Sequence, residues 1–421
     1  MPGELQATKE KKLVTRRQFH AVLGAGLLAR NVRAAGVPIR AITKGPKFHW
    51  FAYYDKLQFD PAGRYALANE VDFEHRSPQP DDVIKVGMID LQDGDRWIEL
   101  GESRAWNWQQ GCMLQWLPGS KDEVIWNDRE GNRFVSHILN VTTRKRRTLP
   151  APVYSVSPDA KWAVYPDFRR LNQTRPGYGY TGIADPYESQ LVSDEAGIWR
   201  LDMETGKSSL ILSLAAAARV PNQHSPWESS AKHWFNHLLH SPDGSRFIFL
   251  HRWRGPAQGR GFGTRMFTAS GEGKDLCVVD PYGGTSHFIW RDPEHILAWA
   301  RHPSHGERFY LYKDKTDRVE VIGKDVMTRN GHCTYLPGNR WILNDTYPDS
   351  ERLQHLYLYE AATGRRVPLG AFRSDPVYTG EWRCDLHPRS SPDGTKVTID
   401  SPHGGNGRQI YLLDVSGIVN T

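Results

Sequence analysis

Apolar strand-like runs alternate with short polar turns along most of this chain. A turn containing Pro, Asp, Gly or Asn recurs seven times, at residues 59–63, 116–119, 156–160, 240–244, 290–293, 336–339 and 391–394. Proline presets one backbone angle of such a turn, and Gly or Asn tolerates the left-handed angle. An apolar run that predicts a β-strand follows each turn, for example 247–250 and 397–400.

Two further strand-like runs lie between successive turns, such as 309–312 and 319–322. Seven copies of a four-strand unit predict an all-β fold, a seven-bladed β-propeller of four-stranded antiparallel blades, over residues 47–421. Two β-sandwich domains are the rival interpretation, but no linker rich in Pro, Gly or Ser separates them. Closure of the ring removes exposed sheet edges. We expect the segment 48–54 to supply the closing strand beside the C-terminal blade.

Three long insertions interrupt the repeat, at 168–197, 213–235 and 252–265, and the second begins with a helix-like run. If the recurrent turn joins the first two strands of each blade, all three insertions lie on the opposite face. Loops on one face of a rigid scaffold commonly carry binding sites. The alternative is that they are surface loops without a role.

The basic charge is concentrated at the N-terminus. The chain of 421 residues has a formal net charge of +6, and the first 35 residues account for +5 of it. A nucleic-acid-binding surface is therefore disfavoured, because it needs basic charge on a folded face. Arg16 and Arg17 precede an apolar run and then small residues, which is the layout of a twin-arginine signal peptide over 1–36. A basic tail or a short amphipathic helix is the alternative.

Export would deliver the mature chain to the periplasm or the medium. No later run is long and apolar enough to predict a membrane-spanning helix. The four cysteines, Cys112, Cys277, Cys333 and Cys384, match neither a zinc motif nor a dense disulfide framework. We expect mostly buried thiols.

Histidine recurs at one position of the repeat. The residues five before the turn proline, or before Asp292 in the fifth copy, are Lys56, Met113, Val153, His237, His287, His332 and His387. Four consecutive blades thus carry His at this position, although the chain has only 17 His. The first strand of each propeller blade lines the central axis, so these four imidazoles are predicted to converge at its mouth.

Asp385 and Arg383 extend this cluster, because residues two apart on a strand point to the same side. Imidazoles and a carboxylate around one point suit a divalent transition metal such as Mn, Fe, Ni or Zn. A site with open positions favours Lewis-acid chemistry. The alternative is a ring of hydrogen-bonded histidines that only closes the channel.

Over most of the chain after the leader, and most strongly from Phe235 to the C-terminus, the sequence resembles the oligogalacturonate lyases, polysaccharide lyase family twenty-two. The segments that carry the resemblance are 236–244, 286–290 and 385–388, the last followed by the Ser-Pro-Asp-Gly turn at 391–394. This turn also resembles those of TolB-like propellers. The resemblance implies a seven-bladed propeller with manganese at its axis that cleaves short pectin fragments by β-elimination.

The resemblance also implies roles for individual residues. It makes His287 and His387 metal ligands and His237 the catalytic base. His332 is an additional candidate ligand. Asp385, a further candidate, stands where the family has another histidine, which leaves the substrate open.

The expected function is therefore that of an exported, metal-dependent lyase acting on an acidic oligosaccharide, with oligogalacturonides first among uronate substrates. The arginines available to hold substrate carboxylates are Arg383, Arg252, Arg254 and Arg301. A non-catalytic TolB-like binding propeller, and a lyase or hydrolase for another uronate glycan, are the alternatives. Hydrolysis is disfavoured because glycosidases use two acidic residues, and only Asp385 is predicted near the axis.

Overall fold

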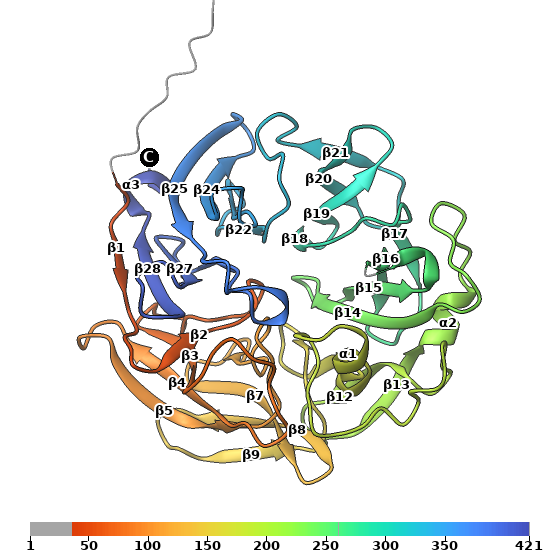
Figure 1. Cartoon of the computed structure of the whole chain (residues 1–421), viewed down its shortest axis with the longest axis horizontal. Helices are drawn as coiled ribbons and strands as arrows, with labels where there is room; N and C mark the ends of the chain where they lie inside the picture. The colour runs from red at the N-terminus through yellow and green to blue at the C-terminus, as the bar shows by residue number, and fades with distance from the viewer. Residues whose placement is uncertain (1–35, 260, 421) are drawn as a thin grey trace, which may run out of the picture. The chain divides into compact units, whose positions relative to one another are not determined.

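Seven four-stranded antiparallel sheets make up the described part of the chain and are arranged as blades around a central axis (Figure 1). The computed structural model describes residues 36–259 and 261–420. The all-β, seven-bladed propeller predicted from the sequence is confirmed. The expected signal peptide, 1–36, lies outside the described residues except for its last position.

The strands follow one another outward from the axis within each blade. The first blade consists of β2 (Phe48–Trp50), β3 (Tyr65–Val71), β4 (Ile84–Asp90) and β5 (Arg96–Ser103), and the second of β6 (Gln115–Trp116), β7 (Glu123–Glu130), β8 (Arg133–Asn140) and β9 (Arg146–Leu149). The third blade consists of β10 (Ser155–Val156), β11 (Trp162–Pro166), β12 (Gly197–Asp202) and β13 (Ser208–Ser213), and the fourth of β14 (Lys232–His240), β15 (Arg246–Arg254), β16 (Gly263–Ser270) and β17 (Cys277–Asp280).

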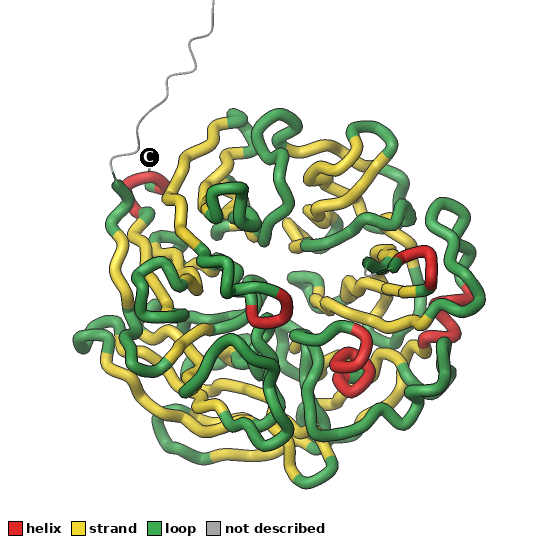
Figure 2. The backbone as a smooth tube through the Cα atoms, in the orientation of Figure 1, coloured by secondary structure: helices red, strands yellow, loops and turns green. Residues whose placement is uncertain are grey.

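The fifth blade consists of β18 (Phe288–Asp292), β19 (His295–His302), β20 (Gly306–Lys313) and β21 (Val319–Ile322), and the sixth of β22 (Thr334–Tyr335), β23 (Trp341–Asn344), β24 (Leu353–Glu360) and β25 (Arg365–Arg373). The seventh blade consists of β26 (Arg389–Ser390), β27 (Lys396–Ser401), β28 (Gln409–Asp414) and β1 (Ile39–Ala41). The helices are short: α1 (Phe168–Thr174), α2 (Leu214–Arg219), α3 (Ser416–Val419), and the 3₁₀ turns η1 (Pro256–Gln258) and η2 (Gly380–Trp382) (Figure 2).

The recurrent turn joins the first and second strands of every blade, as the sequence predicted. In the turn between β14 and β15, the Asp243 carboxylate accepts hydrogen bonds from the Ser241 hydroxyl (2.6 Å) and the Ser245 amide (3.1 Å). Gly244 has a φ of 71°, in the left-handed region that glycine adopts without strain. The three insertions therefore lie on the opposite face, and α1 and α2 are parts of the first two.

The hydrophobic core lies between neighbouring blades. One cluster joins Trp50 of the first blade to Trp126 of the second, and another joins Leu343 of the sixth blade to Ile399 of the last. Because each blade is covered on both faces, its middle strands are buried over most of their length and each contains an apolar run, such as 247–250 in β15. This explains why the strands appear in the sequence as short continuous apolar runs. Cys112, Cys333 and Cys384 are buried and Cys277 is half-buried, all as free thiols, which confirms the prediction for the cysteines.

The ring closes through β1, which pairs with β28 so that Ile39 lies opposite Leu413 and Ala41 opposite Tyr411. The prediction that 48–54 closes the ring was wrong. Phe48–Trp50 is instead the innermost strand of the first blade, and the chain then crosses the axis. The fold accordingly begins before residue 47, because the last blade takes its outermost strand from the N-terminal side.

A chain that begins at residue 42 is expected to unfold more easily than one that begins at residue 36. Cross-strand pairs contribute roughly 0.2–1 kcal/mol each, so loss of the β1 ladder should lower the free energy of unfolding by about 1–3 kcal/mol. Differential scanning calorimetry of the two truncations measures this as a drop of a few degrees in the unfolding midpoint. Equal midpoints would show that β1 does not stabilise the ring.

No helix among the described residues is long and apolar enough to span a membrane.

Candidate metal centre and active site

The predicted histidines meet at the axis. His287 immediately precedes β18, His332 and His387 each lie two residues before their innermost strands, and His237 lies within β14. All four are buried, with at most 4% of the residue exposed. The ring centroids of His287 and His332 are 4.2 Å apart, and those of His332 and His387 are 4.3 Å apart.

Three of the predicted ligands form a compact donor set. His332, Asp385 and His387 each offer one ligand atom, and these atoms lie within 4.8 Å of one another. The Nε2 atoms of both histidines are buried and have no hydrogen-bond partner among the described residues. A buried polar atom without a partner is costly, and a cation supplies the missing interaction. Two imidazoles and a carboxylate therefore fit a divalent transition metal.

Asp345 fixes the orientation of His332. The backbone amide of His332 donates to Asp345 Oδ1 (2.6 Å), and its Nδ1 donates to Oδ2 (2.9 Å). Such a carboxylate behind a histidine selects the tautomer whose Nε2 carries the lone pair. Gly331 permits this approach, because a Cβ there would lie 1.9 Å from the Asp345 carbonyl oxygen. The sequence analysis missed Asp345, which follows β23 and belongs to no motif.

His287 lies beside the donor set and outside the group of three. Its Nδ1 donates to Asn330 Oδ1 (3.0 Å), and its Nε2 lies 3.4 Å from the Tyr347 hydroxyl. Burial, with the neighbouring His332, lowers the pKa of His287 well below its ordinary value. The imidazole is therefore neutral at pH 7, the form in which its Nε2 can accept a hydrogen bond or bind a metal.

Arg383 binds Asp385. Its Nε donates to Asp385 Oδ2 (2.7 Å) and its Nη2 to the Tyr178 hydroxyl (2.6 Å). Burial would lower the pKa of Arg383, but the Asp385 carboxylate raises it well above the ordinary value. Arg383 was predicted to bind a substrate carboxylate. In this structure its guanidinium holds the candidate ligand Asp385 in position.

His237 forms a buried chain of polar groups with two residues that the sequence analysis missed. Its Nε2 donates to Asp55 Oδ2 (2.9 Å), and its Nδ1 lies 3.5 Å from the Tyr53 hydroxyl. The Asp55 Oδ1 atom is 2.9 Å from the Lys56 ammonium. Burial opposes ionisation of Asp55, but Lys56 and His237 outweigh it and lower the pKa to about 2. Burial lowers the pKa of His237 to about 4, only partly opposed by Asp55.

Tyr53, Asp55 and Lys56 come from the segment that follows β2 and crosses the axis. Tyr54 in this segment donates its hydroxyl to the carbonyl of Phe288 in the fifth blade (2.8 Å). The Tyr53 ring lies 4.8 Å from His237 and 5.2 Å from His387. The repeat pattern identified only Lys56 in this segment, at the histidine position, and gave no signal for Tyr53 or Asp55.

The backbone at two of the histidines is in the left-handed region, with φ of 50° at His237 and 42° at His387. Residues other than glycine rarely adopt it, and such strain often occurs at functional sites. At His237 it accompanies a break in the pairing of β14 with β15 between Asn236 and Leu239. The break turns the imidazole out of the ladder and toward the axis.

A cavity of about 180 Å³ adjoins the donor set. Its walls include Tyr53, Arg252, His287 and Tyr347, but His237 is not among them. An open groove of about 740 Å³ shares Gly284 and two further lining residues with this cavity. The cavity and the groove together provide space for a ligand beside the candidate metal centre.

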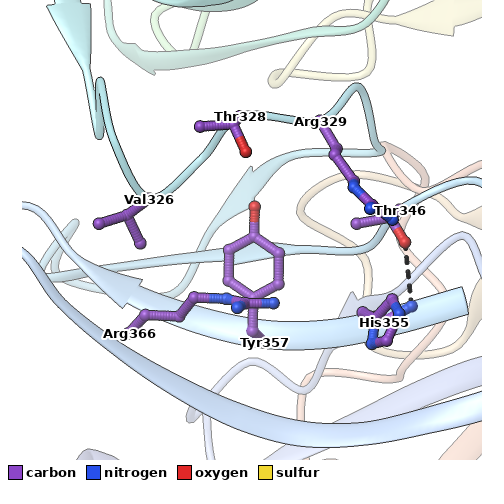
Figure 3. A pocket seen from close by; sticks show the side chains of 7 residues that line it. All are labelled: Val326, Thr328, Arg329, Thr346, His355, Tyr357 and Arg366. Carbon is purple, nitrogen blue, oxygen red and sulfur yellow. Dashed lines mark hydrogen bonds between the residues drawn. The ribbon is translucent and has the colours of Figure 1, made fainter. Parts of the chain in front are cut away.

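A separate hollow of about 270 Å³ lies among residues of the sixth blade and its preceding loop (Figure 3). His355 and Tyr357 of β24 line it, with Arg329 and Arg366. The backbone amide of His355 donates to Thr346 Oγ1 (3.0 Å). No predicted site residue lines this hollow, whereas His287 and Arg252 line the 180 Å³ cavity, so we do not assign the active site to the hollow.

Two other predicted arginines lie away from the cavity walls. Arg254 donates to the carbonyls of Gly261 (2.8 Å) and Thr174 (3.3 Å). Arg301 is exposed and pairs with Glu307 (2.8 Å). Of the four arginines predicted to hold substrate, only Arg252 lines the cavity.

Comparison with known proteins supports the fold. The chain matches no protein-family model and no curated protein. It is similar to an oligogalacturonate lyase solved in complex with manganese, with 16% identity and a TM-score of 0.63 over 91% of this chain and 94% of that one. An oligogalacturonate lyase from Vibrio parahaemolyticus gives 14% identity and a TM-score of 0.63 over 91% and 95%.

A prolyl endopeptidase structure also aligns, with 11% identity and a TM-score of 0.50, over 89% of this chain but 49% of that one. At sequence identities of 11–16%, structural similarity establishes the shared fold and no more than the fold. The resemblance to oligogalacturonate lyases expected from the sequence is confirmed at that level, and propellers that carry other activities share the architecture.

Proposed function

We propose that this protein is a metal-dependent lyase that cleaves uronate-containing oligosaccharides by β-elimination, with oligogalacturonides as its substrate. The proposal rests on one observation above all. His332, Asp385 and His387 form a buried donor set whose two Nε2 atoms lack partners among the described residues. The manganese in a solved lyase of the same fold makes Mn²⁺ the metal that we propose.

His332, His387 and Asp385 hold the metal in this proposal, and His287 lines the cavity beside it. When bound, a divalent cation would neutralise a uronate carboxylate and so acidify the adjacent C5 proton. Arg383 holds the Asp385 carboxylate in position. Asp345 orients the His332 imidazole through its Nδ1.

His237 is the proton acceptor, and Tyr53 connects it to the substrate. Asp55 is ionised and accepts the Nε2 hydrogen of His237, so the lone pair of Nδ1 faces the Tyr53 hydroxyl. Tyr53 lines the cavity. The C5 proton passes to the Tyr53 oxygen as the phenolic proton passes to His237. The electron pair left at C5 forms the C4–C5 double bond, and the C4–O bond breaks with its electron pair leaving on oxygen. The released sugar takes a proton from water, and His237 later returns its proton to solvent.

The distribution of carboxylates favours elimination over hydrolysis. A glycosidase places two acidic groups on either side of the scissile bond. Here Asp385 is bound to Arg383, and Asp55 lies behind His237 and Tyr53, paired with Lys56. The walls of the 180 Å³ cavity contain no Asp or Glu among the described residues.

Export through the twin-arginine route, to the periplasm or the medium, is also part of the proposal. It rests on the sequence of residues 1–36 alone, which carries Arg16 and Arg17 before an apolar run.

Near-ultraviolet absorbance is expected to rise when the protein is incubated with Mn²⁺ and digalacturonate. Elimination creates a conjugated C4–C5 double bond that hydrolysis cannot create, so the signal identifies the reaction class. Protein treated with chelator is the control and should give no rise. If no unsaturated product forms across a broad panel of uronate oligosaccharides, the lyase proposal fails, and a non-catalytic binding propeller becomes the better explanation.

A further inference from the structure

Two guanidinium groups face the 180 Å³ cavity without an anionic partner. Arg252, on β15, is only 5% exposed, and Arg175 directly follows α1. The Nε atoms of both are buried and have no hydrogen-bond partner among the described residues. Within residues 36–259 and 261–420, no carboxylate forms an ion pair with either side chain, and none lines the cavity.

The other buried arginines among the described residues have partners within the chain; Arg265, for example, donates to the backbone carbonyl of Ala217 (2.7 Å). Arg170 contacts Asp185 (3.3 Å) and donates to backbone carbonyls, and Arg389 binds Asp400 (2.8 Å). This is the normal condition, because a buried charge without a partner is strongly destabilising. Arg252, by contrast, is buried without a hydrogen-bond partner for its Nε among the described residues, and it lines a cavity that adjoins the candidate metal centre. No described residue supplies the missing partner of Arg252, and an anionic ligand in the cavity would supply it.

The surroundings hold both guanidiniums ready for such an anion. The ring of Phe262 lies 4.6 Å from the guanidinium carbon of Arg252 and 4.6 Å from that of Arg175. Stacking on an aromatic ring fixes a guanidinium plane while leaving its N–H edge free to donate. Burial, and then the charge of Arg175, lower the pKa of Arg252 to about 10, so it remains cationic at neutral pH.

The same cavity offers partners for sugar hydroxyl groups. Asn236 is buried, lines the cavity, and has an Oδ1 atom without a partner among the described residues. Thr264 and Ser286 also line it. These polar groups favour an anion carried on a polyhydroxylated molecule over one carried on an apolar molecule, because an apolar ligand would leave them without hydrogen bonds.

We propose that Arg252 and Arg175 bind the carboxylate of a second uronate residue, adjacent to the one held at the metal centre. This inference rests on the proposed function and specifies its substrate. His287 lines the cavity and contacts His332 of the donor set, so one oligosaccharide reaches both places. An arginine fork matches a planar carboxylate. The groove that shares Gly284, Ser286 and Tyr347 with the cavity receives the rest of the chain.

The test is equilibrium binding, measured by isothermal titration calorimetry of the full chain in chelator so that neither metal nor turnover contributes. The probes are digalacturonate, the monomer galacturonate and the neutral disaccharide galactobiose. Wild-type protein is expected to bind digalacturonate at least tenfold more tightly than either of the others. Arg252→Met should weaken digalacturonate at least tenfold and Arg175→Met about threefold or more, both with little effect on galactobiose.

Arg308→Met is the matched control, because Arg308 donates only to the backbone carbonyls of Lys324 and Glu307 at the surface. It should bind all three probes as wild type does. Thermal unfolding gives a second readout. Methionine nearly matches the arginine stem in length and removes an unpaired buried charge, so Arg252→Met should keep or raise the unfolding midpoint. A merely structural arginine would lower it.

The inference is overturned if Arg252→Met and Arg175→Met bind digalacturonate as wild type does. It is also overturned if Arg252→Met weakens both disaccharides equally with a lowered midpoint, because that result indicates a folding defect. The proposed function can fail separately. Selective loss of digalacturonate binding in the variants, without any unsaturated product from wild type, would support the carboxylate pocket and refute the lyase.

Discussion

His332→Ala and His387→Ala are each expected to lose the bound metal and to lower turnover at least about a thousandfold. Their Nε2 atoms are buried without a partner in the described chain, and together with Asp385 they make up the donor set. With one imidazole removed, two ligands remain, too few to hold a divalent ion against dialysis. Elemental analysis after dialysis measures the metal content, and the near-ultraviolet assay measures turnover.

Asp345→Asn tests how far the orientation of His332 contributes to metal binding, because it leaves the His332 imidazole itself in place. The amide cannot accept both hydrogen bonds from His332 as the carboxylate does, so metal affinity should fall roughly 10–100-fold while some binding persists. His287→Ala should weaken the metal less than His332→Ala, since both nitrogens of His287 already face Asn330 and Tyr347.

His355→Gln is the control for these substitutions. His355 lies in the hollow of Figure 3 and pairs with Asp349 (2.8 Å), away from the axis. It should retain full metal content and turnover. Wild-type metal affinity in both His332→Ala and His387→Ala would refute the assignment of the centre.

The fold was predictable because its signal is local and repeated. Each turn, such as Ser241 to Gly244, is specified by a few adjacent residues, and seven such turns determine where seven blades begin. Ring closure was mispredicted because Ile39–Ala41 is three residues long and its partner lies at the other end of the chain. Nothing within those three residues identifies that partner.

The candidate site likewise contains residues that the repeat predicted and residues that it did not. His237, His287, His332 and His387 share a register of the repeat, so their convergence followed from the blade geometry. Asp345 did not, because it lies in the loop after β23, where the blades differ from one another.

The role of Arg383 was not predictable for a different reason. The sequence places Arg383 and Asp385 two residues apart, but it does not say that the first neutralises the second. Arg252 was one of four arginines that position alone allowed. Only the three-dimensional structure distinguishes it, as a buried cation without a partner among the described residues.

Tyr53→Phe is expected to lower kcat by roughly 10²–10⁴-fold, the range of a proton-transferring group, while metal content and KM stay near wild type. His237→Ala should have a similar effect, and the double variant should be little worse than either single one, because the two residues act in one chain of proton transfer.

The pH profile of activity adds an independent readout. A protonated imidazole cannot accept a proton, so activity should persist down to moderately acidic pH and fall as pH drops through the His237 pKa of about 4. An exposed histidine would give that loss near its ordinary value of 6.5.

The neighbouring Tyr54 supplies the control for Tyr53. Its hydroxyl is bound to the backbone of Phe288, donating to the carbonyl (2.8 Å) and accepting from the amide (3.0 Å). Tyr54→Phe should therefore lower the unfolding midpoint and leave kcat within a few fold of wild type. Tyr53→Phe should show the reverse pattern, because among the described residues its hydroxyl has only the long contact to His237, and Tyr53 lines the cavity. Should Tyr53→Phe turn over like wild type while His237→Ala does not, the proton must reach His237 by a path other than the phenol. In that case the side chain of Tyr53 would have to move for substrate to contact the imidazole, since His237 does not line the cavity.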